Sequence, residues 1–157
     1  MKIILLLTGK TTEKYIIEGV SNYSKRIARL VNFEIITIPD LRNTGNMTIE
    51  EVKLKEGKQI LNSLTDSDYT VLLDEKGKQL RTIEFAQELE QWFMKSAKRI
   101  VFITGGAWGV SDEIFKRADN VLALSRMTFP HQLVRLLFAE QLYRALSIIK
   151  GTPYHHE

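Results

Sequence analysis

Residues 100–109 read Ile-Val-Phe-Ile-Thr-Gly-Gly-Ala-Trp-Gly, a short aliphatic run followed at once by a glycine-rich turn. A run of this kind predicts a strand buried on both faces that ends in a tight turn. Four other segments have a similar aliphatic character: Ile3–Thr8, Phe33–Ile38, Thr70–Asp74 and Val121–Ser125. Four of the five are apolar nearly throughout instead of alternating with polar residues, which is typical of parallel strands covered by helices on both faces.

Helical patterns lie between most of these segments. The alternation predicts an α/β fold with a mostly parallel sheet of five to six strands flanked by helices. Thr48 and Glu51 form a capping-box pattern, and Pro130 and Gly151 suit the first position and the end of a helix. The expected helices are Thr12–Leu30, Thr48–Leu64, Thr82–Lys95 (buried through Phe85, Ala86, Leu89 and Phe93), a short helix capped by Ser111, and Pro130–Lys150.

The composition is that of a single folded domain covering residues 1–157, with 44% hydrophobic and 26% charged residues. The chain has no cysteine, which excludes disulfides, thiolate zinc sites and a cysteine nucleophile, and fits a reducing compartment. The longest apolar run, Ile3–Leu7, is too short for a membrane span and unlike a signal-peptide core. We therefore expect a soluble, cytoplasmic protein.

Two helices carry features with two interpretations each. In Thr12–Leu30, the residues Lys14, Lys25 and Arg29 lie opposite the apolar stripe, either as an ordinary solvated face or as a track for RNA phosphates. The net charge of +3 does not decide between them. The helix Pro130–Lys150 is apolar on more than one face, which indicates either a subunit interface or deep burial under the sheet.

Three turns that follow predicted strands are the first candidates for a binding site, because ligands of open parallel sheets bind at the carboxyl ends of strands. The turn Gly105–Val110 is neither a GxGxxG motif nor a P-loop, and it is either a ligand-binding loop or simply a tight turn. The link Ser125–His131 joins a buried strand to a long helix. The segment Asp74–Lys78 turns at Gly77.

Hydrolytic and metal chemistry find little support. The sequence has no GxSxG or HExxH motif, and its three histidines are too few and too clustered for an ordinary metal site, so no metal is expected. In the C-terminal tail, Tyr154 stands beside His155 and His156. This segment either stacks an aromatic ring on a base or belongs to a frayed terminus.

The chain resembles, from end to end, the bacterial ribosomal large-subunit pseudouridine N3-methyltransferase family of the SPOUT superfamily. The resemblance rests on the following motifs: Leu73-Asp74-x-x-Gly77-Lys78, Ile103-Thr104-Gly105-Gly106, Leu124-Ser125-Arg126-Met127-Thr128-Phe129-Pro130-His131, Arg135, Glu140-Gln141-Leu142-Tyr143-Arg144-Ala145 and Pro153-Tyr154-His155. The opening Lys2-Ile3 strand with Gly9-Lys10, and Lys55-Glu56-Gly57, fit as well.

The resemblance implies a C-terminal trefoil knot, a homodimer and S-adenosylmethionine bound in a bent shape within the knot. The residues it places against the cofactor are Leu73, Gly105, Leu124, Ser125, Arg126, Met127, Thr128 and Phe129. Arg126 stands at a position that varies in the family, so it receives no individual role, and neither does His156. The resemblance further implies that the tail of one subunit reaches its partner's cofactor pocket, which makes Arg144, Tyr154 and His155 candidate catalytic residues.

Methyl transfer needs few catalytic side chains, because the protein mainly positions donor and acceptor. The sulfonium loses its charge during transfer, so a pocket of backbone amides and carbonyls suits it better than a close carboxylate. His155 is the preferred group to assist loss of the acceptor's N–H proton, and Tyr154 would stack or orient. Arg144 would hold a phosphate or the cofactor's carboxylate, with an ordinary interface ion pair as the alternative.

The expected function is S-adenosylmethionine-dependent methylation of N3 of a pseudouridine in 23S ribosomal RNA, on the assembled ribosome. The target base would have to be unstacked to reach the pocket. Two alternatives stay open: a related SPOUT methyltransferase with another RNA target, and a ribosome-associated binding module without turnover.

Overall fold

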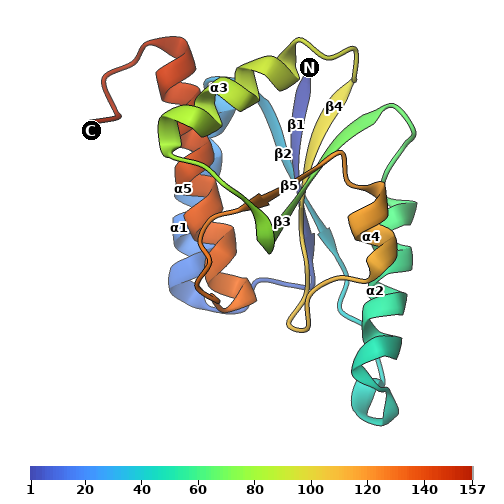
Figure 1. Ribbon diagram of the computed structural model, residues 1–157. Coiled ribbons are helices and arrows are strands. Elements are labelled where there is room, and N and C mark those ends of the chain that lie inside the picture. Colours follow the sequence, from blue (N-terminus) through green and yellow to red (C-terminus); the bar gives the residue numbers. More distant parts are fainter. Residues whose placement is uncertain (157) are drawn as a thin grey trace.

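The computed structural model describes residues 1–156, and its centre is a five-stranded sheet (Figure 1). The strands stand in the order β2-β1-β4-β3-β5, and every pair is parallel. Their bounds are Lys2–Thr8 (β1), Asn32–Ile38 (β2), Asp68–Gln79 (β3), Arg99–Thr104 (β4) and Asn120–Ala123 (β5). The predicted α/β class and parallel sheet are confirmed.

Helices cover both faces of this sheet. On one face α5 packs against α1 and α3, and on the other α2 packs against α4 (Figure 1). The helices are α1 (Lys14–Ala28), α2 (Ile49–Asn62), α3 (Thr82–Phe93), α4 (Asp112–Arg117) and α5 (His131–Lys150), with a 3-10 turn η1 at Thr44–Asn46. No helix in residues 1–156 combines the length and apolar character that a membrane span requires.

The three-layer arrangement explains why the strands are apolar on both sides. In β1, the side chains of Ile3, Leu5 and Leu7 belong to the core beneath α1, α3 and α5. Ile4 and Leu6 alternate with them and belong to the second core, beneath α2 and α4. A strand with a core on each face has no solvated side, so the five residues from Ile3 to Leu7 are all apolar.

Strand β3 differs most from its predicted bounds. It runs on to Gln79, whereas the sequence pattern ends it at Asp74. Leu122 of β5 pairs with Leu73 and again with Lys78, so the intervening residues form an irregularity in the ladder. The backbone of Gly77 lies directly against that of β5, because an added Cβ would be 2.6 Å from the carbonyl carbon of Val121. The polar turn expected at Gly77 is therefore part of an extended segment that crosses β5.

Several helix ends also differ from prediction in detail. Pro130 takes the N-cap position instead of the first helical position, and Trp92 is buried where Phe93 was expected. Ser111 occupies the N-cap of α4, but its side chain makes no capping hydrogen bond because it faces Gly57 of α2, where an added Cβ would be 2.6 Å from Oγ. The Thr48 cap is confirmed by a 3.1 Å bond from the Glu51 N–H, and Gly151 closes α5 at φ 72°.

Candidate functional site

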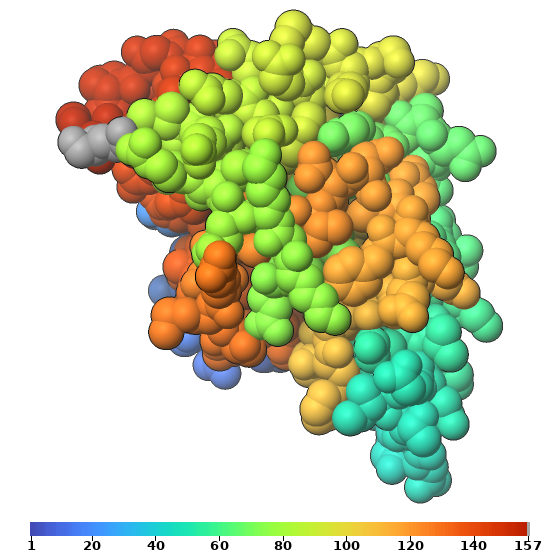
Figure 2. All heavy atoms as spheres, in the orientation of Figure 1, coloured from blue at the N-terminus to red at the C-terminus, as the bar shows by residue number. Residues whose placement is uncertain are grey.

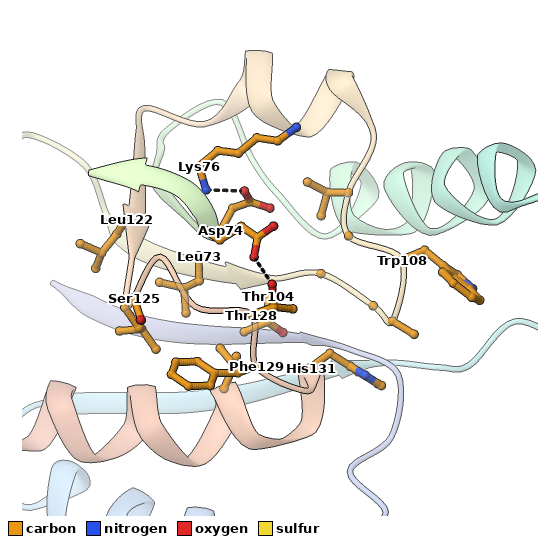
Figure 3. A pocket seen from close by; sticks show the side chains of 18 of the residues that line it. Leu73, Asp74, Lys76, Thr104, Trp108, Leu122, Ser125, Thr128, Phe129 and His131 are labelled. Atoms are coloured by element: carbon orange, nitrogen blue, oxygen red, sulfur yellow. Dashed lines mark hydrogen bonds between the residues drawn. The ribbon is translucent and has the colours of Figure 1, made fainter. Parts of the chain in front are cut away.

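A cavity of about 430 Å³ lies where the predicted turns meet at the carboxyl ends of the strands (Figure 3). The structure brings seven of the eight candidate cofactor residues into its lining: Leu73, Gly105, Leu124, Ser125, Met127, Thr128 and Phe129. Arg126 is exposed and is not part of the lining. The three segments expected to be turns do come together at one cavity, although Asp74–Lys78 lies within β3 instead of forming a separate turn, and the cofactor role of their residues stays a prediction.

The glycine-rich turn forms one wall of this cavity. Gly106 and Gly109 make an antiparallel bridge, and the Gly109 N–H donates to the Gly106 carbonyl oxygen at 3.1 Å. Gly109 has φ 85°, a conformation that favours glycine. The two interpretations of the sequence are thus compatible, since the segment is a tight turn that requires glycine and also lines the cavity.

The opposite wall is built from the β5–α5 link and the extension of β3. Thr128 Oγ1 donates to Glu75 Oε2 at 2.8 Å and so joins the two segments (Figure 3). Within the link, the Met127 N–H donates to Ser125 Oγ at 3.0 Å. These local bonds hold a stretch of non-helical backbone open to the cavity, where its amide and carbonyl groups are available to a ligand.

The lining is divided into an apolar interior and a polar rim. The apolar side chains come from the ends of β3 and β5, the link and the first turn of α5: Leu73, Leu122, Leu124, Phe129 and Val134. Charged and polar side chains at the rim include Lys53, Asp74 and Lys76. A site of this composition and size suits a small amphipathic molecule with a flat apolar part and polar ends.

The lining also contains residues that received no individual role from the sequence, among them Lys53 of α2, Trp108 of the glycine turn and His131 of α5. Burial lowers the pKa of His131, and the nearby Arg135 lowers it further, while Asp40 acts in the opposite direction. His131 is therefore neutral at pH 7. The position of His131 directly after Pro130 could have predicted its place in the cavity lining, because the start of a helix that follows a buried strand faces the carboxyl edge of the sheet.

Glu56 of α2 supports the glycine turn from outside the cavity. An added Cβ at Gly106 would lie 2.6 Å from Glu56 Oε2, so the carboxyl group rests on the backbone of the turn. Burial raises the pKa of Glu56, and the charge of Asp40 raises it further. The residue was quoted in the Lys55-Glu56-Gly57 motif without a role, and its contact with the turn provides a structural one.

The candidate catalytic residues lie at the other end of α5. Arg144 follows His131 by 13 residues, which is about 20 Å along a helix. Its Nε donates to Glu140 Oε1 at 2.9 Å, and its guanidinium lies over the Tyr154 ring. None of Arg144, Tyr154 and His155 lines the cavity in one copy of the chain.

Tyr154 is held in a polar and aromatic cluster. Its hydroxyl lies 3.5 Å from that of Tyr23 and donates to Glu140 Oε1 at 3.3 Å, and its ring meets Tyr143 edge-on. The hydrogen bond with Tyr23, burial and the negative charge of Glu140 raise the pKa of Tyr154 to about 12. Tyr154 is thus a protonated hydroxyl at neutral pH, and the tail is packed against α5 and α1 through residue 154.

A second hollow of about 590 Å³ lies among α1, α3 and α5. Its lining is largely apolar and includes Leu80, Leu124, Phe129, Leu136 and Leu137. Two of these residues, Leu124 and Phe129, also line the first cavity, so the two hollows share a wall. The buried residues of α5, among them Phe138 and Leu142, face the sheet, whereas Leu136 and Leu137 face this hollow.

The predicted RNA-contacting residues are on the surface of α1. Lys14, Lys25 and Arg29 are exposed, and none of them forms an ion pair within the described part of the chain. Residues 1–156 contain no group of three or more His, Cys, Asp and Glu side chains placed to hold a metal ion.

The parallel sheet, the helices on both faces and the cavity at the strand ends are typical of α/β domains that bind ligands at the carboxyl edge of the sheet. Residues 1–155 match the family described as predicted SPOUT methyltransferase, and the chain belongs to this family.

Relatives and solved structures agree with this assignment. The chain is 45% identical to "Ribosomal RNA large subunit methyltransferase H" of Phocaeicola vulgatus over all 157 residues of both chains, and 45% identical to the protein of the same name in Christiangramia forsetii, over 99% of each. It shares its fold with a probable methyltransferase from Bordetella pertussis, with a TM-score of 0.52 at 12% identity, covering 92% of this chain and 93% of that one. A probable methylase family protein from Haemophilus influenzae gives a TM-score of 0.51 at 9% identity, over 96% and 66%.

Proposed function

We propose that this chain transfers a methyl group from S-adenosylmethionine to N3 of a pseudouridine in 23S ribosomal RNA, and that it does so on the assembled ribosome. The observation that carries the proposal is the meeting of three strand-end turns in one cavity, lined by seven of the residues at which the family resemblance puts the cofactor. End-to-end similarity to proteins named as large-subunit ribosomal RNA methyltransferases supports the RNA substrate.

The cavity fits the cofactor in size and chemistry. A volume of about 430 Å³ is within the range of small-molecule sites. Leu73, Leu122 and Leu124 offer apolar surface to the adenine, and the backbone of the glycine turn and of the link offers donors and acceptors to its polar edges. When bound, the cofactor supplies a methyl carbon whose bond to sulfur breaks as the acceptor nitrogen bonds to it.

The residues of the chain bind and orient the reactants. The two carboxylates of the lining already accept hydrogen bonds, Asp74 from the Lys76 N–H at 2.9 Å and Glu75 from Thr128. These hydrogen bonds hold the two carboxylates in place, so they are not free to pair with the positive sulfonium. Such pairing would be unfavourable for catalysis, because a close carboxylate would stabilise the sulfonium more in the ground state than in the transition state.

The proposal includes a homodimer in which the tail of one subunit completes the cavity of the other. Two observations support it. Arg144, whose guanidinium lies over the Tyr154 ring, is about 20 Å along α5 from the cavity residue His131 of its own chain. An apolar hollow lined by Leu136 and Leu137 shares a wall with that cavity. His155 is assigned the acceptor of the N3 proton. Tyr154, whose pKa is raised to about 12, is assigned a donor and orienting role, and Arg144 a phosphate or carboxylate contact.

The proposal also includes the C-terminal trefoil knot and the RNA contact. The knot is supported by the close approach of β3 and β5, where Leu122 pairs with both Leu73 and Lys78 and where only a glycine fits at residue 77. The RNA contact is assigned to the exposed row Lys14, Lys25 and Arg29, because unpaired cations on one helix face can neutralise phosphates. The site of action is the cytoplasm, where ribosomes are found.

The test is methyl transfer to ribosomes from cells that lack the protein. Labelled S-adenosylmethionine, purified protein and such ribosomes are expected to yield one labelled nucleoside, which mass spectrometry then maps. A label on another nucleoside would favour a related methyltransferase with a different target. Cofactor binding by calorimetry without any incorporation would favour a binding module that lacks turnover, and the absence of both would contradict the proposal.

A further inference from the structure

The glycine turn carries an exposed tryptophan that the proposed reaction does not use. Trp108 is 57% exposed, although its position on the turn makes it part of the cavity lining. The other tryptophan, Trp92, is 3% exposed and packs against Phe85 and Phe102 in the core. A large aromatic ring exposed at the edge of a cavity offers a face on which a flat ring of another molecule can stack.

The turn holds Trp108 in a defined position. The ring follows Ala107 between the two bridged glycines, with the Gly109 N–H bonded to the Gly106 carbonyl oxygen. Neither glycine has a side chain that would cover the indole, and an added Cβ at Gly109 would meet no atom within 4 Å. The turn thus supports the backbone at Trp108, and the exposure of the side chain leaves the indole accessible to a partner outside the chain.

Trp108 points away from the interior of the cavity. In Figure 3 its ring extends outward from the turn, on the side opposite Leu73 and Leu122. We therefore expect a ligand in the apolar interior to leave the outer face of the indole accessible. Lys53 also belongs to the lining, and its ammonium is 3.7 Å from Glu50 on an exposed helix surface. The mouth of the cavity therefore combines an aromatic face with a cationic side chain.

We propose that Trp108 stacks on a nucleobase of the RNA next to the base that enters the cavity. The inference rests on the proposed function, because it takes RNA as the molecule that approaches this mouth. Single-stranded RNA is recognised by stacking of unstacked bases on aromatic side chains, together with cations that follow the backbone. Trp108 is then a positioning residue for the substrate strand, and Lys53 contacts the adjoining phosphate.

Fluorescence tests the contact directly. Trp108→Ala leaves Trp92 as the only tryptophan, so the difference in emission between the wild type and this variant reports Trp108 alone. Short oligouridylate is expected to quench the Trp108 emission, and S-adenosylhomocysteine without RNA is expected to leave it nearly unchanged. Quenching by S-adenosylhomocysteine alone would show that the indole stacks on adenine and would overturn the inference. The absence of quenching by oligouridylate would also overturn it.

Kinetics with ribosomes separate this role from a structural one. Trp108→Ala is expected to raise KM for the RNA substrate about tenfold, with kcat within about twofold of the wild type, because the stacking energy of one base is lost while the reacting base still enters the cavity. Trp108→Phe, which keeps a ring, is expected to recover most of the loss. The control is Met94→Ala, which removes a side chain that is 68% exposed at the end of α3, outside the cavity.

The outcomes distinguish this inference from the proposed function. If the wild type methylates ribosomes and Trp108→Ala does so with unchanged KM, the stacking role is wrong and the proposed function stands. A fall in kcat at unchanged KM would place Trp108 at the reacting base and would likewise overturn the inference. If the wild type neither methylates ribosomes nor binds oligouridylate, the proposed function fails together with the inference.

Discussion

Arg135 Nη1 donates a hydrogen bond to the backbone carbonyl oxygen of Gly9 at 2.9 Å, which ties the start of α5 to the end of β1. The same guanidinium donates to the Thr8 carbonyl oxygen and to Thr11 Oγ1, both at 2.7 Å. The Arg135 side chain is completely buried. It forms no ion pair within 4 Å in residues 1–156. Two backbone carbonyls and the Thr11 hydroxyl accept hydrogen bonds from this buried cation, whose Nε has no partner in the same range.

The first prediction concerns this arginine. Arg135→Leu is expected to lower the free energy of unfolding by about 2–4 kcal/mol, because the carbonyl oxygens of Thr8 and Gly9 lose charged donors in a buried position. Urea denaturation measures the change. Arg42→Leu, which removes an exposed arginine, is the control and is expected to stay within about 0.5 kcal/mol of the wild type. Equal effects of both substitutions would contradict a specific role for the buried hydrogen bonds.

The second prediction concerns the crossing of β3 and β5. Gly77→Ala puts a methyl group 2.6 Å from the Val121 carbonyl carbon, and the obstructing atoms are backbone atoms that cannot rotate away. We expect a loss of about 1–3 kcal/mol in the free energy of unfolding from overpacking. Gly45→Ala is the matched control, since an added Cβ there meets no atom within 4 Å and the φ angle of Gly45 is not positive. It is expected to be neutral or slightly stabilising.

The crossing also shows what local sequence patterns cannot predict. Residues 74–78 are polar and contain a glycine, so they have the pattern of a turn. In the structure they are extended because Leu122 and Ala123, more than 40 residues later, pair with Lys78 and Gln79. A partner so distant in sequence leaves no trace in the periodicity of the segment. The three strand-end turns, by contrast, were predicted to meet because parallel strands bring their carboxyl ends to one edge.

Other parts of the site depend on tertiary placement in the same way. Lys53 and Trp108 carry no motif, and they reach the mouth of the cavity only because α2 and the glycine turn approach it from different directions. Arg135 looks like a charged residue on an apolar helix, and its complete burial follows from the exposed carbonyl oxygens at the end of β1. The apolar pattern of α5 left two interpretations open. Phe138 is buried under the sheet, and Leu137 lies at a hollow, so the subunit interface stays a prediction.

The third prediction is a pH dependence at Glu56. Burial, together with the charge of Asp40, raises the pKa of this carboxyl above its usual 4.5. A raised pKa means that the folded state binds the proton more tightly, so the contribution to stability is full below pH 4.5 and is lost as the pH rises through the folded pKa. Glu56→Gln should therefore gain stability relative to the wild type as the pH rises from 4.5 to 7. Urea unfolding across this range measures the difference, and parallel curves would refute the prediction.

The fourth prediction concerns the cations of α1. Substitution of Lys14, Lys25 and Arg29 by Gln is expected to weaken binding to ribosomal RNA. It is also expected to reduce the steepness of log affinity against log salt concentration by about 2–3, because binding releases roughly one counterion fewer for each phosphate contact that is lost. Filter binding over a salt series measures both quantities. The control removes the same charge from exposed lysines on three other parts of the chain: Lys58, Lys98 and Lys150. Equal slopes for the two triple variants would show that the α1 face is only solvated surface.

The fifth prediction tests whether the site is shared between subunits. Tyr154→Ala removes a tail residue and leaves the cavity intact, whereas Ser125→Trp fills the cavity and leaves the tail intact. Each variant alone is expected to lose methyl transfer while circular dichroism shows an unchanged fold. When the two variants are unfolded together and refolded as a mixture, half of the dimers contain one copy of each variant. In such a mixed dimer, one of the two sites combines the unaltered cavity of one chain with the unaltered tail of the other.

The mixture is therefore expected to recover about a quarter of the wild-type rate, because half of the dimers carry one working site out of two. The distance along α5 is the physical reason, since a tail that packs near Arg144 cannot act at the cavity of its own chain. Truncation after Thr152 should abolish transfer in the same manner, and its mixture with Ser125→Trp should recover to the same degree. A mixture with no activity would place the tail in its own subunit's site or remove it from the reaction.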